Sequence, residues 1–222
     1  MPHTLNRLKA FCAATLVWVA AAAPALADLT GTFALSGGQQ FVVEYRDADN
    51  FRLSVDQAGF ELMRGGELYL GIRNGERYNI MHIGQMARQM QQFGGSNALA
   101  GLLGGDRDRL PSKAQFEPLG RSETVAGITG EVYAVTTHSA AGARTEEAVL
   151  ARHPQLETMQ AAVLDAAGQT LQLLGPGPAR EHGQIIQQIR EAGLGAVIRY
   201  GAEFELVELH TDAIAEARFQ LP

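Results

Sequence analysis

Cysteine and lysine are nearly missing from this chain of 222 residues. Its one cysteine, Cys12, lies close to the N-terminus, so the chain beyond it can form no disulfide, no thiolate metal site and no cysteine nucleophile. Lys113 is the one lysine after residue 27, and no cluster of lysine and arginine occurs. With 24 acidic against 18 basic residues, the composition argues against a nucleic-acid-binding protein.

Signatures of common catalytic sites are missing as well. No Gly-x-Ser-x-Gly sequence is present, so a serine hydrolase would lack its nucleophile turn. The glycine-rich stretch at 94–105 lacks the Gly-Lys-Ser/Thr sequence that brings a lysine to phosphates. The histidines show no His-x-x-x-His spacing, which leaves a zinc site without support. We therefore predict a protein that is not an enzyme and has no cofactor.

The first 27 residues have the pattern of a cleavable signal peptide. Arg7 and Lys9 form a basic start, an apolar run rich in alanine follows at 10–23, and Ala25-Leu26-Ala27 matches the small-x-small cleavage pattern. An uncleaved membrane anchor is the alternative, but Pro24 and the weakly hydrophobic alanines disfavour it. We predict export to the periplasm and no membrane span after cleavage.

Short apolar or alternating segments separated by Gly, Asn and Asp dominate the remaining chain, and they are typical of antiparallel strands. Asn74-Gly75, the strongest two-residue hairpin signal, joins two of these segments. We predict strands at 29–35, 40–45, 51–55, 60–63, 67–72, 77–81, 116–119, 123–125, 128–137, 144–150, 196–200, 203–210 and 214–221.

Three segments have the spacing of amphipathic helices. The first spans 83–93, the second begins at Pro154, and the third covers 180–192. Helices gathered between many strands predict one α+β domain over 28–222, in which a curved antiparallel sheet, an incomplete barrel, is covered by helices. Residues 94–113 carry no element, and so long a connection is typical of either a functional lid or a disordered loop.

Several stretches of the chain resemble bacterial envelope domains with the LolA-like lipoprotein-carrier fold. These are "FRLSV", "ELYLGIRNGERYNIMH", "LGRSETVAGITGEVYAV" and the ending "RYGAEFELVELHTDAIAEARFQLP", of which the third is similar to a hairpin of an uncharacterised secreted family in that group. The resemblance implies an incomplete barrel around helices, with a concave apolar face able to hold an acyl chain or another hydrophobic ligand. It implies binding or carriage, and no functional residue of the carriers can be matched to a position here.

The inner face of such a curved sheet is the predicted ligand site. Ring-bearing and branched side chains recur there at alternate positions, namely Phe41, Val43, Phe51, Leu53, Leu68, Leu70 and Ile72. The same residues would be ordinary core if the interior were filled. We predict that the ligand is a hydrophobic small molecule or lipid, or that an envelope protein is the partner.

A copper site is the alternative function. Met81, His82, Met86 and Met90 lie close together in the sequence, and thioether with imidazole ligands suits copper. Met86 and Met90 also fall on the apolar stripe of the helix predicted at 83–93, where methionine commonly fills gaps in a core.

Overall fold

The computed structural model describes residues 28–56, 58–93, 113–172, 183–184 and 187–222, and the side chains of all these except 90–93. Its described strands form a single antiparallel sheet in the order β6-β5-β4-β3-β2-β1-β11-β10-β9-β8-β7. Their bounds are β1 Leu29–Leu35, β2 Gln40–Asp47, β3 Asn50–Val55, β4 Gly59–Arg64, β5 Glu67–Asn74, β6 Arg77–His82, β7 Lys113–Val125, β8 Ile128–Ser139, β9 Gly142–Ala151, β10 Ala196–Tyr200 and β11 Phe204–His210.

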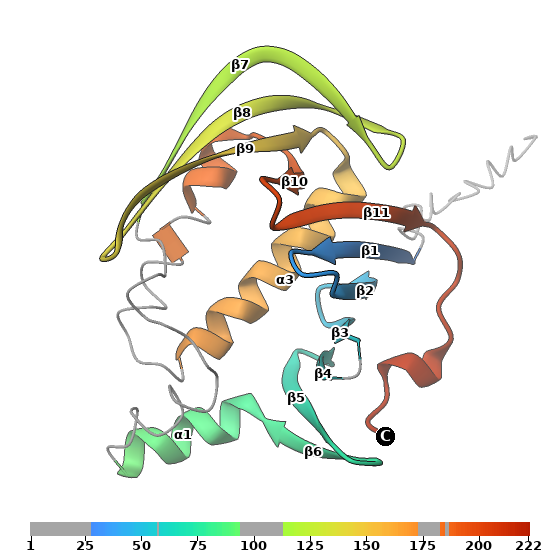
Figure 1. Ribbon diagram of the computed structural model, residues 1–222. Coiled ribbons are helices and arrows are strands. Elements are labelled where there is room, and N and C mark those ends of the chain that lie inside the picture. The colour runs from blue at the N-terminus through green and yellow to red at the C-terminus, as the bar shows by residue number, and fades with distance from the viewer. Residues whose placement is uncertain (1–27, 57, 94–112, 173–182, 185–186) are drawn as a thin grey trace, which may run out of the picture.

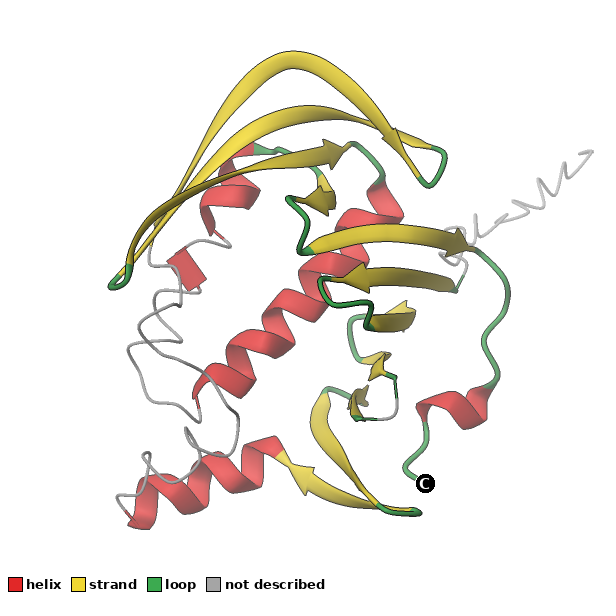
Figure 2. Ribbon diagram, viewed as in Figure 1, coloured by secondary structure: helices red, strands yellow, loops and turns green. Residues whose placement is uncertain are grey.

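This sheet is strongly curved, and helix α3 (Pro154–Gln172) runs along its concave side (Figure 1). The long strands β7, β8 and β9 arch over one end of α3, while α1 (Ile83–Phe93) follows β6 at the other end (Figure 2). The sheet does not close, because β6 and β7 are its two edges. The predicted architecture, a curved antiparallel sheet with helices, is confirmed at this level.

The core lies between the concave face of the sheet and α3. Helix α3 buries Leu156, Met159, Ala162 and Ala166, which recur every three or four residues and so share one face. Apolar residues at alternate strand positions, such as Phe51 and Met63, meet this face in one cluster. The stripe that predicted a helix from Pro154 is thus confirmed, and α3 continues past Gly168.

The predictions for the other helical segments have mixed outcomes. Helix α1 occupies 83–93, as its spacing predicted. Of the third segment, 187–192 are helical, but part of it lies outside the described residues. The lid or loop predicted at 94–113 also lies outside them, apart from Lys113, which begins β7. No helix in the described part of the chain is long and apolar enough to cross a membrane.

The strand prediction is wrong in two places. Segments 116–119 and 123–125 belong to one long strand, β7, whose pairing with β8 shifts register between Pro118 and Ser122. Gly120 lies there with a φ of 67°, which only glycine adopts without strain. Segment 214–221 forms no strand; it contains a 3-10 helix, η2 (Glu216–Phe219), because its apolar residues cover a sheet face instead of pairing with an edge.

The C-terminal segment covers the outer face of the sheet at β3 and β4. Phe219 packs there with Phe60 and Leu62, and all three side chains are at most 2% exposed. Ion pairs hold the segment in place, because Arg218 donates to both oxygens of the buried Glu44, with Nε at 2.7 Å and Nη2 at 2.5 Å. The outer face of the sheet is therefore covered at β3 and β4.

A side-chain amide completes the backbone hydrogen bonding of β10. Strands β10 and β11 pair only at Arg199 with Glu205 and at Tyr200 with Phe204, so β11 leaves Val197 unpaired on that side. Gln160 of α3 accepts from the Val197 N–H at 2.9 Å and donates to its carbonyl at 2.6 Å. This amide joins the helix to the middle of the sheet.

Replacing that amide should destabilise the fold. We expect Gln160→Leu to lower the free energy of unfolding by about 2 kcal/mol, because two partly buried backbone groups lose their partners. Gln169→Leu, the same change at an exposed position of α3, is the control and should change stability by less than about 0.5 kcal/mol. Urea denaturation of both variants measures the difference. Equal stabilities would contradict the role assigned to Gln160.

Candidate functional site

A hollow of about 300 Å³ lies between α3 and the middle of the sheet. Three groups of side chains enclose it, from the first two strands, from α3 with the segment that follows it, and from the last two strands. The lining residues are Phe33, Phe41, Val43, Met159, Gln160, Val163, Leu164, Ile189, Val197, Tyr200 and Phe204. We call this space the concave pocket.

Three stacked phenylalanine rings form one wall of the concave pocket. The ring centroids of Phe33 and Phe41 are 4.8 Å apart, and those of Phe33 and Phe204 are 5.0 Å apart. Phe41 and Phe204 are only partly buried, whereas Phe33 is 1% exposed. The wall is therefore anchored in the core and presents aromatic surface to the space beside it.

The polar groups of the concave pocket are few. Gln160 and Tyr200 are the lining residues with polar side chains, and both polar ends of the Gln160 amide are occupied by the Val197 backbone. A polar group of a ligand would lose its hydrogen bonds to water on entering the pocket and would find few partners there to replace them. The chemistry of the concave pocket favours an apolar occupant.

Two of the seven predicted ligand-site residues, Phe41 and Val43, line the concave pocket. Phe51 and Leu68 are fully buried in the core on the same side, and Leu53 and Leu70 pack against that core while remaining partly exposed. Ile72 shares the face of β5 with Leu68 and Leu70 but lies outside the clustered core residues. Apart from Phe33 of β1, the remaining pocket residues come from the C-terminal half of the chain, which sequence reasoning did not connect to this face.

A single carboxyl interrupts this apolar face. Cross-strand pairing places Val43, Leu53, Glu61, Leu70 and Met81 in one row, because each is directly opposite the next in the register of β2 to β6. Burial among these neighbours raises the pKa of Glu61 above its ordinary value. Sequence reasoning missed this residue, although an acidic position among apolar ones in strand 60–63 was a visible signal.

Two residues of the copper alternative, Met81 and His82, lie on opposite faces of the sheet. Met81 lies opposite Leu70 on the concave side, whereas His82 lies opposite Tyr69, which packs with the outer cluster. Nδ1 of His82 accepts the backbone N–H of Gln85 at 3.0 Å, and its Nε2 is 3.5 Å from Oε1 of Glu67. In the described part of the chain no three His, Cys, Asp or Glu side chains are grouped to hold a metal.

The other two residues of that alternative, Met86 and Met90, belong to α1. Met86 packs against the concave core, and the Met90 side chain lies outside the described residues.

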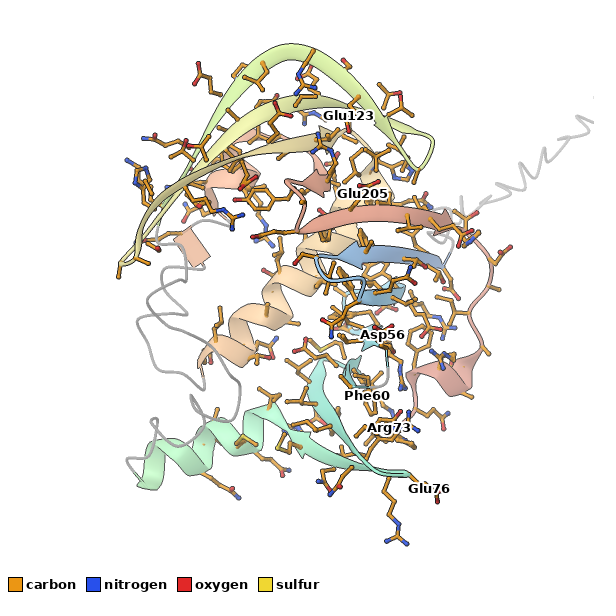
Figure 3. All side chains as sticks on the ribbon, viewed as in Figure 1. Asp56, Phe60, Arg73, Glu76, Glu123 and Glu205 are labelled. Carbon is orange, nitrogen blue, oxygen red and sulfur yellow. The ribbon has the colours of Figure 1, made fainter. Side chains whose placement is uncertain are left out.

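Three carboxylates of the arched strands, those of Glu123, Glu146 and Glu147, are engaged in ion pairs. Arg199 donates to both oxygens of Glu123 at 2.8 Å, and it lies opposite Glu205 in the pairing of β10 with β11. Figure 3 labels Glu123 and Glu205. Arg121 pairs with Glu147 at 2.5 Å, which lowers the pKa of that carboxyl. These groups stabilise the arch and are not arranged as an acid and base facing a cleft.

Comparisons of the chain with known protein families, with curated proteins and with solved structures found no match. The concave pocket and the surrounding sheet are therefore the features that point to a function. Fold alone would not define function, since one architecture serves many activities.

Proposed function

We propose that this protein is an exported, non-catalytic periplasmic protein that binds a hydrophobic ligand in the concave pocket. The observation that carries the proposal is the nearly apolar hollow of about 300 Å³ between α3 and the sheet. Pockets for small molecules begin at about 300 Å³ and are lined mainly by apolar and aromatic side chains with few polar groups. A lipid chain fits this chemistry better than a polar metabolite.

The LolA-like resemblance of the sequence supports this proposal. A curved, unclosed antiparallel sheet with a helix on its concave side is the architecture that the resemblance implies. The signal peptide predicted at 1–27 would direct the chain to the periplasm, and its cleavage would release the chain there. There, a carrier would shield an acyl chain from water by the same burial that stabilises the core.

Ligand binding can be tested directly. Native mass spectrometry of protein purified from its own host should show an additional mass that is lost on organic extraction and identified as a lipid or another apolar molecule. As a second measurement, the uncharged dye N-phenyl-1-naphthylamine should become fluorescent with the extracted protein, and decanol should displace it.

The outcomes separate the competing functions. An extracted protein that neither carries an apolar mass nor binds the dye would refute the proposal. A bound copper mass would favour the site at Met81, His82, Met86 and Met90 instead, and it should then be lost in a His82→Ala variant.

A further inference from the structure

We propose that Glu61 selects the head group of the ligand, and that the preferred ligand is a single-chain amphiphile with a primary ammonium group. This inference rests on the proposed function, because the concave pocket must first hold the apolar chain. It adds the chemical class of the ligand and the residue that recognises it.

The position of Glu61 carries the argument. Val43 lines the concave pocket, Leu53 lies opposite it, and Glu61 lies opposite Leu53 on the next strand. Neighbouring strands are ~4.8 Å apart, so Glu61 is ~10 Å from the pocket wall along the same face. A chain seated in the concave pocket and extending across Leu53 would bring its end to this carboxyl.

Among the described residues, none supplies a counter-charge to Glu61. Its row neighbours are Leu53 and Leu70, and no hydrogen bond or ion pair joins the Glu61 side chain to another residue in the described ranges. Its side chain is only partly buried, so a ligand can reach it. Burial among apolar side chains disfavours the charged carboxylate and so raises the pKa of Glu61. A cationic partner would stabilise the carboxylate and offset this desolvation.

Charge complementarity decides between the head groups. An ammonium would pair with the Glu61 carboxylate, and a charge-assisted hydrogen bond is stronger than a neutral one. A carboxylate or phosphate would instead meet a like charge, in a chain whose net charge is −6. A hydroxyl head group could bond to Glu61 but would leave its charge unpaired.

The experiment compares decylamine, decanol and decanoic acid at neutral pH and below their micelle concentrations, by displacement of N-phenyl-1-naphthylamine. We expect the wild-type protein to bind decylamine at least about tenfold more tightly than decanol, and decanoic acid most weakly. Glu61→Gln should weaken decylamine binding about tenfold and leave decanol binding unchanged, which also shows that the variant is folded. Glu76→Gln, at the exposed turn between β5 and β6, makes the same charge change as a control (Figure 3).

Each result has a separate meaning. If no decyl ligand displaces the dye, the head-group inference is wrong, and if the protein neither binds the dye nor carries an apolar mass, the pocket is wrong as well. If all three bind with equal affinity, or if decylamine loses as much affinity in Glu76→Gln as in Glu61→Gln, the role of Glu61 is refuted while the proposed function stands. The comparison of the three decyl ligands in the wild-type protein does not depend on how well any variant folds.

Discussion

Val163→Trp is expected to abolish ligand binding while leaving the protein folded. Val163 lines the concave pocket from α3 and is only partly buried, so a larger side chain at this position extends into the hollow. An indole there occupies the volume that an apolar ligand would take. We expect dye and decanol affinity to fall by more than about tenfold, because most of the buried apolar contact is lost.

Stability distinguishes a hollow from a filled core at the same position. In a close-packed core, added volume costs about 1–3 kcal/mol, whereas a real hollow accepts it for less than about 1 kcal/mol. Gln169→Trp, at an exposed position of α3, is the matched control and should bind normally. Dye titration and urea denaturation of both variants give the two quantities. Undiminished binding in Val163→Trp would place the ligand elsewhere.

Phe219→Ala should produce the largest loss of stability, about 3 kcal/mol. The Phe219 ring is 2% exposed against Phe60 and Leu62, and the Arg46 guanidinium lies 4.5 Å from its centroid. Truncation leaves a cavity on the outer face and removes the cation–π contact, and Phe→Ala changes in cores cost about 3–5 kcal/mol.

The measurement for this prediction is the free energy of unfolding in urea, with Gln220→Ala as the control. Gln220 is exposed in the same segment, so its truncation should cost less than about 0.5 kcal/mol. A loss below about 1 kcal/mol for Phe219→Ala would mean that the C-terminal segment contributes little to the fold. Ligand binding should persist in the folded fraction, since Phe219 packs on the face opposite the concave pocket.

Local patterns predicted most of the strands because their causes are local. Asn74 ends β5, Arg77 begins β6, and Gly75 between them has a φ of 64°, as the Asn-Gly hairpin signal requires. The apolar alternation of 214–221 misled because an extended segment that covers a sheet shows the same pattern as a strand that joins one. The periodicity of apolar residues predicts which side chains are buried, but it does not predict which part of the protein they pack against.

The concave pocket could be predicted only in part, for a related reason. Phe41 and Val43 were recognised from alternation within one strand, but Val197, Tyr200 and Phe204 reach the same space through long-range pairing. The register between distant strands depends on the whole fold and leaves no local signal. Glu61 was passed over because one acidic residue in a strand usually faces water, and only the cross-strand row places it among leucines.

The middle of the sheet is built from the two ends of the described chain. Strand β1 pairs with β11, Thr30 lying opposite His210, while the edges β6 and β7 are consecutive in sequence. Closing so large a loop costs entropy before any contact repays it, and such topologies fold in milliseconds to seconds. A chain that lacks β11 therefore cannot join β1 to β10, so the two halves of the sheet come together only after β11 is present.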